Sequence, residues 1–503
     1  MKGRCLLLYI LLLAPVFLQA QQIIFSEPLK EDDRDMNFDI IGRVNKNILV
    51  FKNMRNRYAL NIYNDSMELK EKVDLEFLPN KTFNVDYVAY ADHFYLIYQH
   101  QKKGILYCMA VKMDANGQKA GEPVVLDTTS VGMMGDNKIY SAINSEDKKK
   151  IMVFKVQRRD DRLHFVIQLY DNQLQLIHKT KQSIEYNDRK DVLSDFYLDN
   201  TGNFVFNIAR QKTSREHPSS VLLVTKAALQ DTFSFHELDL NKNYVDDLKV
   251  KVDNLNKKYI ISAFYYKDRS DNIQGLLCNI WDAAGDSMHA KVFTEFSDDL
   301  RAMVKTTGNS KFAFNDFFIR NLILKKDGSF IITAEDFTSQ STGANRWNRY
   351  DYLYGSPYLN SYDYYAYNPA YGYYYRPFGS FNQSVRYYYD NVLVLSLSPK
   401  GIPEWSNVIH KQQFSDDNDN YLSFNTFNTG GELHFLFNDI SKRDKLLSEN
   451  IITPDGNARR NPTLKTNERD YEFMPRFAKQ IGGRQVIIPC SYRGQICFAK
   501  VNF

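Results

Sequence analysis

The feature that most constrains the fold is a short motif, a polar turn followed by three or four apolar residues, which recurs along the chain. Its apolar runs begin at Ile48, Phe94, Ile151, Phe204, Tyr259, Phe330, Leu433 and Val486. Five of the seven intervals between these runs fall between 46 and 57 residues. A period of this length is typical of repeat proteins in which each repeat is one supersecondary unit.

Each copy of the motif belongs to a group of four short apolar runs separated by turns. A second strand-like run ends in a turn of Asp, Asn, Pro or Gly, as in VKMDANG and IITPDG. Aromatic and β-branched residues dominate, so we expect β-strands throughout. Four strands in a repeat of about 50 residues are typical of a β-propeller blade. Only the segment 298–308 (DDLRAMVKTTG) has the acidic start and glycine stop of a short helix.

The two ends of the chain indicate how such a ring closes. The eighth repeat stops at Phe503 after three strands, while Ile23, Ile24 and Phe25 form a spare apolar run before the first full repeat. Pairing this run with the last strand completes the eighth blade and leaves no open edge. We therefore predict an all-β fold for residues 21–503, a single eight-bladed β-propeller of four-stranded antiparallel blades. Seven blades are the structural alternative.

The repeats resemble β-propellers of the large exported kind found in Gram-negative envelopes. The resemblance is architectural and covers nearly all of residues 21–503. The GH…WD pair, the kelch double glycine and the S-x-D-x-G-x-T-W box do not occur, so no named subfamily follows. A propeller fold is compatible with many functions and does not choose among them.

One stretch, 339–390, departs from the regular pattern. It holds fifteen of the 34 tyrosines and no Lys or His. It lies between the second and third strands of the sixth repeat, so it replaces a hairpin tip. A disordered loop, a lid over the propeller and a binding element are the three interpretations, and Tyr suits binding because it offers a large contact area at low entropy cost. The candidate binding residues in it are Trp347, Tyr350, Tyr352, Tyr354, Tyr358, Tyr362, Tyr364, Tyr365, Tyr367, Tyr371, Tyr373, Tyr374 and Tyr375.

Charged residues are expected on the same face of the ring. The tips between second and third strands are basic, with Arg158, Arg159, Lys442 and Arg443 as candidate binding residues. Either they are ordinary solvated tips, or they form a positive rim that steers an acidic partner. The connections between blades carry acids that we place at the mouth of the central channel: Asp35, Asp191, Asp246, Asp417 and Asp470. Such acids either fold the connections by accepting backbone N–H bonds or take part in function.

The first 20 residues have the pattern of a secretory signal, with two early basic residues, an apolar run from Leu6 to Leu13 and a cleavage site ending at Ala20. The apolar run is too short to span a bilayer as a helix. We therefore expect export to the periplasm, the outer membrane or the outside of the cell. We expect no transmembrane segment in residues 21–503.

Export permits disulfides. Cys490 and Cys497 flank a predicted tight turn at Arg493 and Gly494, and counting outward from this turn makes them cross-strand partners. A disulfide is one alternative. Two buried free thiols are the other, because disulfide geometry is usually poor at a hydrogen-bonded pair.

Catalytic signatures do not occur in the chain. There is no H-E-x-x-H, G-x-S-x-G, Walker A or dinucleotide-binding glycine pattern, and no two of the nine histidines have metal-ligand spacing. We therefore expect no catalytic residue, no metal and no cofactor. The net charge of +4 is too small to indicate nucleic acid.

These patterns predict an exported, non-catalytic binding or scaffold protein. We expect an accessory subunit of a cell-envelope assembly that contacts a protein partner through the Tyr-rich loop and the basic rim. The alternative is a glycan-binding or glycoside-hydrolysing propeller that uses the channel-mouth carboxylates. Peripheral contact with a membrane is compatible with either hypothesis.

Overall fold

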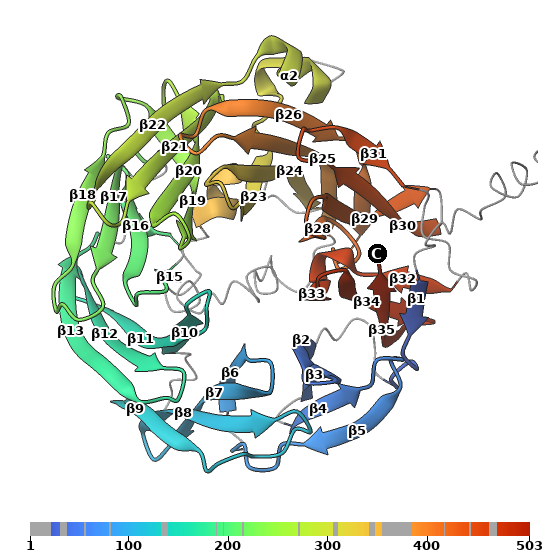
Figure 1. The fold of residues 1–503 in the computed structure, drawn as a ribbon. Coiled ribbons are helices and arrows are strands. Elements are labelled where there is room, and N and C mark those ends of the chain that lie inside the picture. Colours follow the sequence, from blue (N-terminus) through green and yellow to red (C-terminus); the bar gives the residue numbers. More distant parts are fainter. Residues whose placement is uncertain are drawn as a thin grey trace, which may run out of the picture.

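The computed structural model describes residues 22–30, 38–54, 57–79, 82–131, 139–187, 189–194, 196–213, 216–269, 272–304, 310–341, 348–354, 385–416, 418–441, 444–461 and 470–503. The predicted signal segment 1–20 lies outside these residues. The described chain forms eight antiparallel sheets arranged as blades in a ring (Figure 1). The predicted eight-bladed propeller is therefore confirmed.

The first half of the chain forms four blades. In each blade the strands follow one another from the innermost to the outermost position of the ring (Figure 1). Blade 1 contains β2 (Phe38–Val44), β3 (Asn47–Met54), β4 (Arg57–Tyr63) and β5 (Leu69–Asp74), and blade 2 contains β6 (Thr82–Ala89), β7 (His93–Lys102), β8 (Ile105–Asp114) and β9 (Val124–Ser130). Blade 3 contains β10 (Tyr140–Asn144), β11 (Lys150–Arg159), β12 (Arg162–Asp171) and β13 (Leu176–Glu185), and blade 4 contains β14 (Asp191–Leu193), β15 (Tyr197–Leu198), β16 (Phe204–Arg210), β17 (Ser220–Lys226) and β18 (Ser234–Leu238).

The second half repeats the arrangement with more additions. Blade 5 contains β19 (Tyr244–Asp253), β20 (Lys258–Tyr266), β21 (Gly275–Asp282) and β22 (Ser287–Glu295), and blade 6 contains β23 (Phe317–Leu324), β24 (Phe330–Ser341), β25 (Val385–Leu397), β26 (Pro403–Ile409) and β27 (Gln413–Asp416). Blade 7 contains β28 (Phe424–Asn428), β29 (Leu433–Ser441), β30 (Asp444–Ile452) and β31 (Ala458–Arg460), and blade 8 contains β32 (Tyr471–Phe473), β33 (Lys479–Gly482), β34 (Gln485–Tyr492), β35 (Gln495–Asn502) and β1 (Gln22–Phe25).

The ring closes with strands from both ends of the chain, as predicted. Strand β1 pairs antiparallel with β35, with Ile23 opposite Val501 and Phe25 opposite Ala499. In Figure 1 the blue β1 lies beside the red strands of blade 8. This pairing supplies the fourth strand of blade 8 and covers the edge that β35 would otherwise expose.

The core lies between neighbouring blades, and each recurring apolar run forms the second strand of a blade. In β16, Phe204 and Phe206 pack in the cluster shared with blade 3, whereas Val205 packs in the cluster shared with blade 5. All three side chains are fully buried. Successive side chains of a strand point to opposite faces, and both faces of each blade are covered, which explains why the runs are continuously apolar. Each such side chain contributes roughly 1.5–3 kcal/mol of stability.

Several hairpins between second and third strands are two-residue turns. Both central residues have positive φ at Asp160 and Asp161 (54° and 55°) and at Arg493 and Gly494 (51° and 77°). Turns of this kind match the twist of antiparallel strands. The tips are therefore short, polar and exposed, and they lie at one end of the ring together with the connections that enter each first strand.

Blade 6 differs from this plan at its hairpin tip. Strands β24 and β25 are extended and pair as far as Ser341 and Val385, with β27 added alongside β25. The predicted Tyr-rich stretch 339–390 lies in this hairpin, but its two ends, 339–341 and 385–390, belong to the paired strands β24 and β25. Between them, the structure describes the helix α3 (Arg349–Tyr354). The predicted helix 298–308 appears as α2 (Asp298–Val304). Two short 3-10 helices also occur: η1 (Ser310–Phe312) before blade 6 and η2 (Pro475–Phe477) in blade 8. None of the described helices is long and apolar enough to cross a bilayer.

Candidate binding site

The root of the Tyr-rich insertion is docked on the end of the ring that carries the hairpin tips between second and third strands. We call this end the insertion face. Asn348 precedes helix α3 as its N-cap, and its side-chain Oδ1 accepts the backbone N–H of Tyr350 at 2.8 Å. An Asn at this position satisfies a donor that the first helical turn leaves unpaired. The helix thereby directs Arg349, Tyr350 and Tyr352 toward three different blades.

Arg349 joins the insertion to Asp246, one of the predicted channel-mouth acids. Its Nε and Nη2 donate to the two carboxylate oxygens of Asp246 at 2.7 and 3.0 Å. Arg349 Nη1 donates to the carbonyl oxygens of Asn315 and Phe317. The guanidinium also lies 4.2 Å from the centroid of the Phe318 ring. This two-pronged ion pair connects residues 103 positions apart.

Asp246 is completely buried at the start of β19, rather than open at the mouth of the channel. Tyr266 donates its hydroxyl to Asp246 at 2.6 Å, and His217 stacks on the Tyr266 ring at 4.0 Å. Burial, together with the neighbouring Asp246 carboxylate, raises the pKa of Tyr266 well above its usual value. Burial lowers the pKa of His217, although Asp246 acts in the opposite direction. The cluster therefore pairs one carboxylate with one guanidinium and a neutral hydroxyl.

Tyr350 and Tyr352 extend the anchor to blades 4 and 6. The Tyr350 hydroxyl accepts a hydrogen bond from Gln211 Nε2 at 3.1 Å. The Tyr352 ring packs on Phe318 and Phe337 at 4.4 and 4.8 Å between centroids. Both tyrosines were predicted as binding residues, and in the structure their side chains contact the blades of the propeller.

A second ionic group stabilises the same face between blades 6 and 7. Arg320 donates to Glu335 at 3.1 Å and to the Tyr352 hydroxyl at 3.2 Å. Lys411 lies 2.8 Å from the other Glu335 oxygen, and Ser423 donates to Glu335 at 2.7 Å. All of the Glu335 carboxylate is buried, and buried carboxylates are stable only when paired in this way.

Blade 8 contributes a third ion pair, through Arg476 of η2. Arg476 donates to both oxygens of Asp419 at 2.8 and 2.9 Å, and the Tyr389 hydroxyl donates to Asp419 at 2.7 Å. Burial alone would raise the pKa of Asp419, but the Arg476 guanidinium lowers it to about 2. The insertion face of blades 5 to 8 is thus tied together by buried ion pairs.

The remaining described acids of the predicted channel mouth also have structural partners. Asp191 accepts the backbone N–H of Asn187 at 2.9 Å and lies 3.5 Å from Arg210, and burial raises its pKa. Asp470 pairs with Arg493 at 3.0 Å on the surface. Asp35 and Asp417 lie outside the described residues. No two of the three described acids are brought together as a catalytic pair.

Of the four residues named for the predicted basic rim, the structure describes the side chain of Arg159 alone. Arg159 pairs with Asp160 at 3.1 Å, with both side chains exposed. At the tip of blade 5, between β20 and β21, Arg269 pairs with Glu216 at 3.2 Å and Lys267 pairs with Glu295 at 3.1 Å. Exposed pairs of this kind contribute little to stability, but they reduce the positive field of the tips.

Two more predicted site residues lie in described elements. Arg158 lies in β11 and Tyr354 ends α3, but both side chains lie outside the described part of the structure. The following lie outside the described residues: Trp347, Tyr358, Tyr362, Tyr364, Tyr365, Tyr367, Tyr371, Tyr373, Tyr374, Tyr375, Lys442 and Arg443.

Cys490 and Cys497 are cross-strand partners in β34 and β35, as the register count predicted. Both are buried free thiols with their Sγ atoms 2.7 Å apart. Burial raises the pKa of Cys490 well above its usual value. The thiolate, which is the reactive form, is therefore disfavoured in the folded protein.

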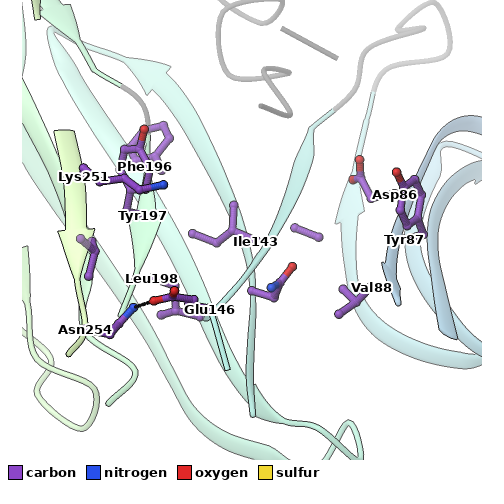
Figure 2. A pocket seen from close by; sticks show the side chains of 13 residues that line it. Asp86, Tyr87, Val88, Ile143, Glu146, Phe196, Tyr197, Leu198, Lys251 and Asn254 are labelled. Carbon is purple, nitrogen blue, oxygen red and sulfur yellow. Dashed lines mark hydrogen bonds between the residues drawn. The ribbon is translucent and has the colours of Figure 1, made fainter. Parts of the chain in front are cut away.

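Sequence reasoning did not anticipate a pocket at the opposite end of the ring. It has a volume of about 400 Å³ and is lined by the innermost strands of blades 2 to 5 (Figure 2). Asp86, Tyr87 and Val88 lie on one side, and Phe196, Tyr197 and Lys251 lie on the other. These residues come from four separate repeats, so no local motif signals the pocket.

Comparisons with known proteins bear on the fold alone. No family model matches the chain, and no curated protein is similar to it in sequence. A crystal structure of the polysaccharide lyase Uly1 is similar with a TM-score of 0.40 and 10% identity, covering 84% of this chain and 90% of that one. The β-propeller domain of Vanderwaltozyma polyspora Nup133 gives a TM-score of 0.40 and 9% identity, covering 90% and 99%.

Prolyl oligopeptidase B from Galerina marginata gives a TM-score of 0.39 and 8% identity, and it matches over 94% of this chain and 55% of its own. This chain therefore spans about half the length of that peptidase. These proteins differ in what they do, and the likeness is too distant to carry a functional argument. The chain is an eight-bladed β-propeller without an assigned family.

Proposed function

We propose that this protein is an exported, non-catalytic binding scaffold, an accessory subunit of a protein assembly in the cell envelope. Its partner is a protein that contacts the insertion face through the Tyr-rich insertion and the extended hairpin of blade 6. The proposal of export rests on the signal-like pattern of residues 1–20.

The observation that carries this proposal is the buried anchor at the root of the insertion. An Arg349–Asp246 pair with completely buried carboxylate oxygens is a strong constraint on where the insertion leaves the ring. Tyr350 and Tyr352 restrict it further through blades 4 and 6. Functional loops are commonly mounted on rigid scaffolds, and a fixed root reduces the entropy lost on binding.

Exposed side chains beside the anchor have the composition of a protein interface. Phe414 of β27 is 49% exposed and lies 6.4 Å from the Tyr388 ring. Arg386 lies 5.4 Å from the Phe414 centroid and pairs with Asp416 at 2.7 Å on the surface. Tyr, Phe and Arg are enriched at protein interfaces and among their energetically dominant residues.

The state of the acids favours binding over hydrolysis. A glycosidase needs two carboxylates that face a common substrate, one of them available as a proton donor. Asp246 and Asp419 are instead each held by an arginine, and Glu335 is held by Arg320 and Lys411. These three acids therefore give no support to the hydrolase hypothesis, and the anchored insertion favours binding.

The experiment compares partner recovery by tagged variants purified from envelope fractions, with quantitative mass spectrometry. One variant replaces residues 355–384 with a short Gly–Ser linker, which keeps α3, β24 and β25. A second is Phe414→Ala. The matched control is Lys149→Glu, an exposed substitution at the opposite end of the ring.

We expect the deletion to lower recovery of a specific partner at least about ten-fold, and Phe414→Ala to lower it several-fold, because interface aromatics dominate binding. The Lys149→Glu protein should recover the partner normally. Equal recovery by the deletion variant and the wild type contradicts the proposal. Glycan hydrolysis by the purified wild type would contradict its non-catalytic part.

A further inference from the structure

The pocket of about 400 Å³ lies at the end of the ring opposite the insertion face, near the turns that join first and second strands. Its wall includes the end of β10, the turn that holds Glu146, and the end of β19. It is therefore separate from the anchor of the insertion and independent of the proposed partner. Its volume falls within the range of about 300–1,000 Å³ that is typical of small-molecule sites.

A bulge in the inner strand of blade 4 shapes one wall of this pocket. Leu193 pairs with Ile208 and Tyr197 pairs with Val205. The inner strand thus advances four positions where its partner advances three, which is the register of a bulge. Bulges redirect side chains and are frequent beside binding sites. Here the bulge places Phe196 and Tyr197 in the pocket wall.

The aromatic wall is supported from behind. The Phe196 ring stacks on Phe204 at 5.3 Å with an interplanar angle of 10°, and it lies 5.1 Å from Phe206. Phe204 and Phe206 are fully buried. The position of Phe196 is therefore set by the core between blades 3 and 4 before any ligand arrives.

Polar side chains of the pocket wall are held in place by hydrogen bonds between blades. Asn254 donates its side-chain N–H to Glu146 at 2.8 Å, and it accepts the backbone N–H of Asn200 at 2.7 Å (Figure 2). One Glu146 oxygen is used in this bond, and the carboxylate is exposed to solvent. Preorganised acceptors of this kind bind a ligand at low entropy cost.

Charges of both signs face the pocket. Asp86 and Lys251 lie on opposite sides (Figure 2), and Asn144 also lines the pocket. Asp86 is buried, and its carboxylate accepts a hydrogen bond from the Asn84 side-chain amide at 2.7 Å. The mixture gives no strong field of either sign, which disfavours a highly charged ligand.

We propose that this pocket binds a neutral saccharide of one or two sugar units. Sugars present apolar C–H faces to aromatic rings and hydroxyls that both donate and accept hydrogen bonds. Phe196 and Tyr197 supply the rings, and the Glu146, Asn144 and Lys251 side chains supply acceptors and donors. No bond is made or broken in this proposal, which concerns binding alone.

The test uses the full chain and four probes: glucose, N-acetylglucosamine, cellobiose and diacetylchitobiose. Saturation-transfer NMR detects binding, and calorimetry measures its affinity. Glucuronate and the dipeptide Gly-Gly serve as charged comparison ligands. We expect at least one neutral probe to bind, and to bind more tightly than either charged ligand.

Two variants locate the binding. Ile143→Trp fills the space between the two walls in Figure 2, and we expect it to weaken the probe at least about ten-fold. Lys251→Ala removes one donor without filling space, and we expect a loss of about three-fold or more. The matched control is Thr426→Trp in β28, the inner strand of blade 7, outside the pocket.

The proposal is overturned if no neutral probe binds the wild-type chain, or if glucuronate or the dipeptide binds more tightly than all four. It is also overturned if both pocket variants, folded by circular dichroism, bind the probe as tightly as the Thr426→Trp control. If Ile143→Trp fails to fold, Lys251→Ala alone decides between these outcomes.

Discussion

At the scale of single residues, the decisive contact is the ion pair between Arg349 and Asp246. The Asp246 side chain is completely buried, and the Arg349 side chain is 11% exposed. Burial lowers the pKa of Arg349, but the Asp246 carboxylate outweighs this and raises it. A buried charge that loses its partner is strongly destabilising, whereas removing both charges together is often tolerated.

We predict that Arg349→Met lowers the free energy of unfolding by about 3–5 kcal/mol, because Asp246 is left buried without a cation. Urea denaturation measures the change. The double variant Arg349→Met with Asp246→Asn should recover part of the loss. The control Arg386→Met breaks an exposed pair and should change stability far less. Equal effects of Arg349→Met and Arg386→Met would show that the buried pair is not an anchor.

A second residue-scale feature is the pKa of Asp336 in β24. Burial, followed by the nearby Asp316 and Asp390 carboxylates, raises this pKa to about 7. The value in the unfolded chain is about 3.9. Between these two values the folded state holds a proton that the unfolded state has lost. The contribution of Asp336 to the free energy of unfolding therefore falls as the pH rises from about 4 to 7.

We predict that Asp336→Asn raises the free energy of unfolding relative to wild type. This gain should be larger at pH 8 than at pH 5 by on the order of 2 kcal/mol. Chemical denaturation of both proteins at the two pH values measures the difference. Asp419→Asn is the control, because the pKa of Asp419 is about 2 and its carboxylate stays ionised throughout this range. A pH-independent difference for Asp336→Asn would contradict the assignment.

At the scale of elements, β1 is the piece that closes the ring. It is only four residues long, yet Ile24 packs in the cluster between blades 8 and 1, and Ile23 and Phe25 pack in the cluster between blades 7 and 8. Phe25 also stacks on Tyr471 at 3.9 Å. Without it, β35 would be an exposed edge strand.

We predict that a chain starting at residue 30 is less stable than one starting at residue 21 by on the order of 5 kcal/mol, since three partly buried apolar side chains are lost. Thermal and urea unfolding measure this. The truncated chain should also associate through β35 in size-exclusion chromatography. Gln22→Ala, at the exposed end of β1, is the control. Unchanged stability after truncation would rule out a closing role for β1.

At the scale of the whole molecule, the propeller presents two separate sites at its two ends. The anchored insertion lies at one end, where blades 4, 5 and 6 meet α3. The pocket lies at the other end, against the inner strands of blades 2 to 5. Strand β19 reaches both sites, with Asp246 at its start and Lys251 near its end, but the two sites have no side chain in common.

We predict that the two sites behave independently, because perturbations at distant sites without shared partners are additive. Replacing residues 355–384 should leave the affinity for a bound saccharide within about two-fold, and Ile143→Trp should leave partner recovery unchanged. Calorimetry and the envelope purification measure the two effects. A larger change in saccharide affinity after the replacement, or lower partner recovery by Ile143→Trp, would show that the two ends of the ring are coupled.

Local pattern in the sequence determined the repeat, the eight blades, the closing strand and the position of the insertion. These follow from short apolar runs and turns, because strand period and hairpin geometry depend on residues close together in the chain. The cross-strand register of Cys490 and Cys497 followed for the same reason.

Only the tertiary structure decided which charges meet and where a pocket opens. Asp246 was predicted to line a channel mouth, but it is buried under Arg349, which lies 103 residues away. The pocket is assembled from four blades, and a bulge between β14 and β15 shapes its wall. Both depend on the packing of neighbouring blades. Burial and pairing across that packing are properties of the closed ring, and no single repeat contains them.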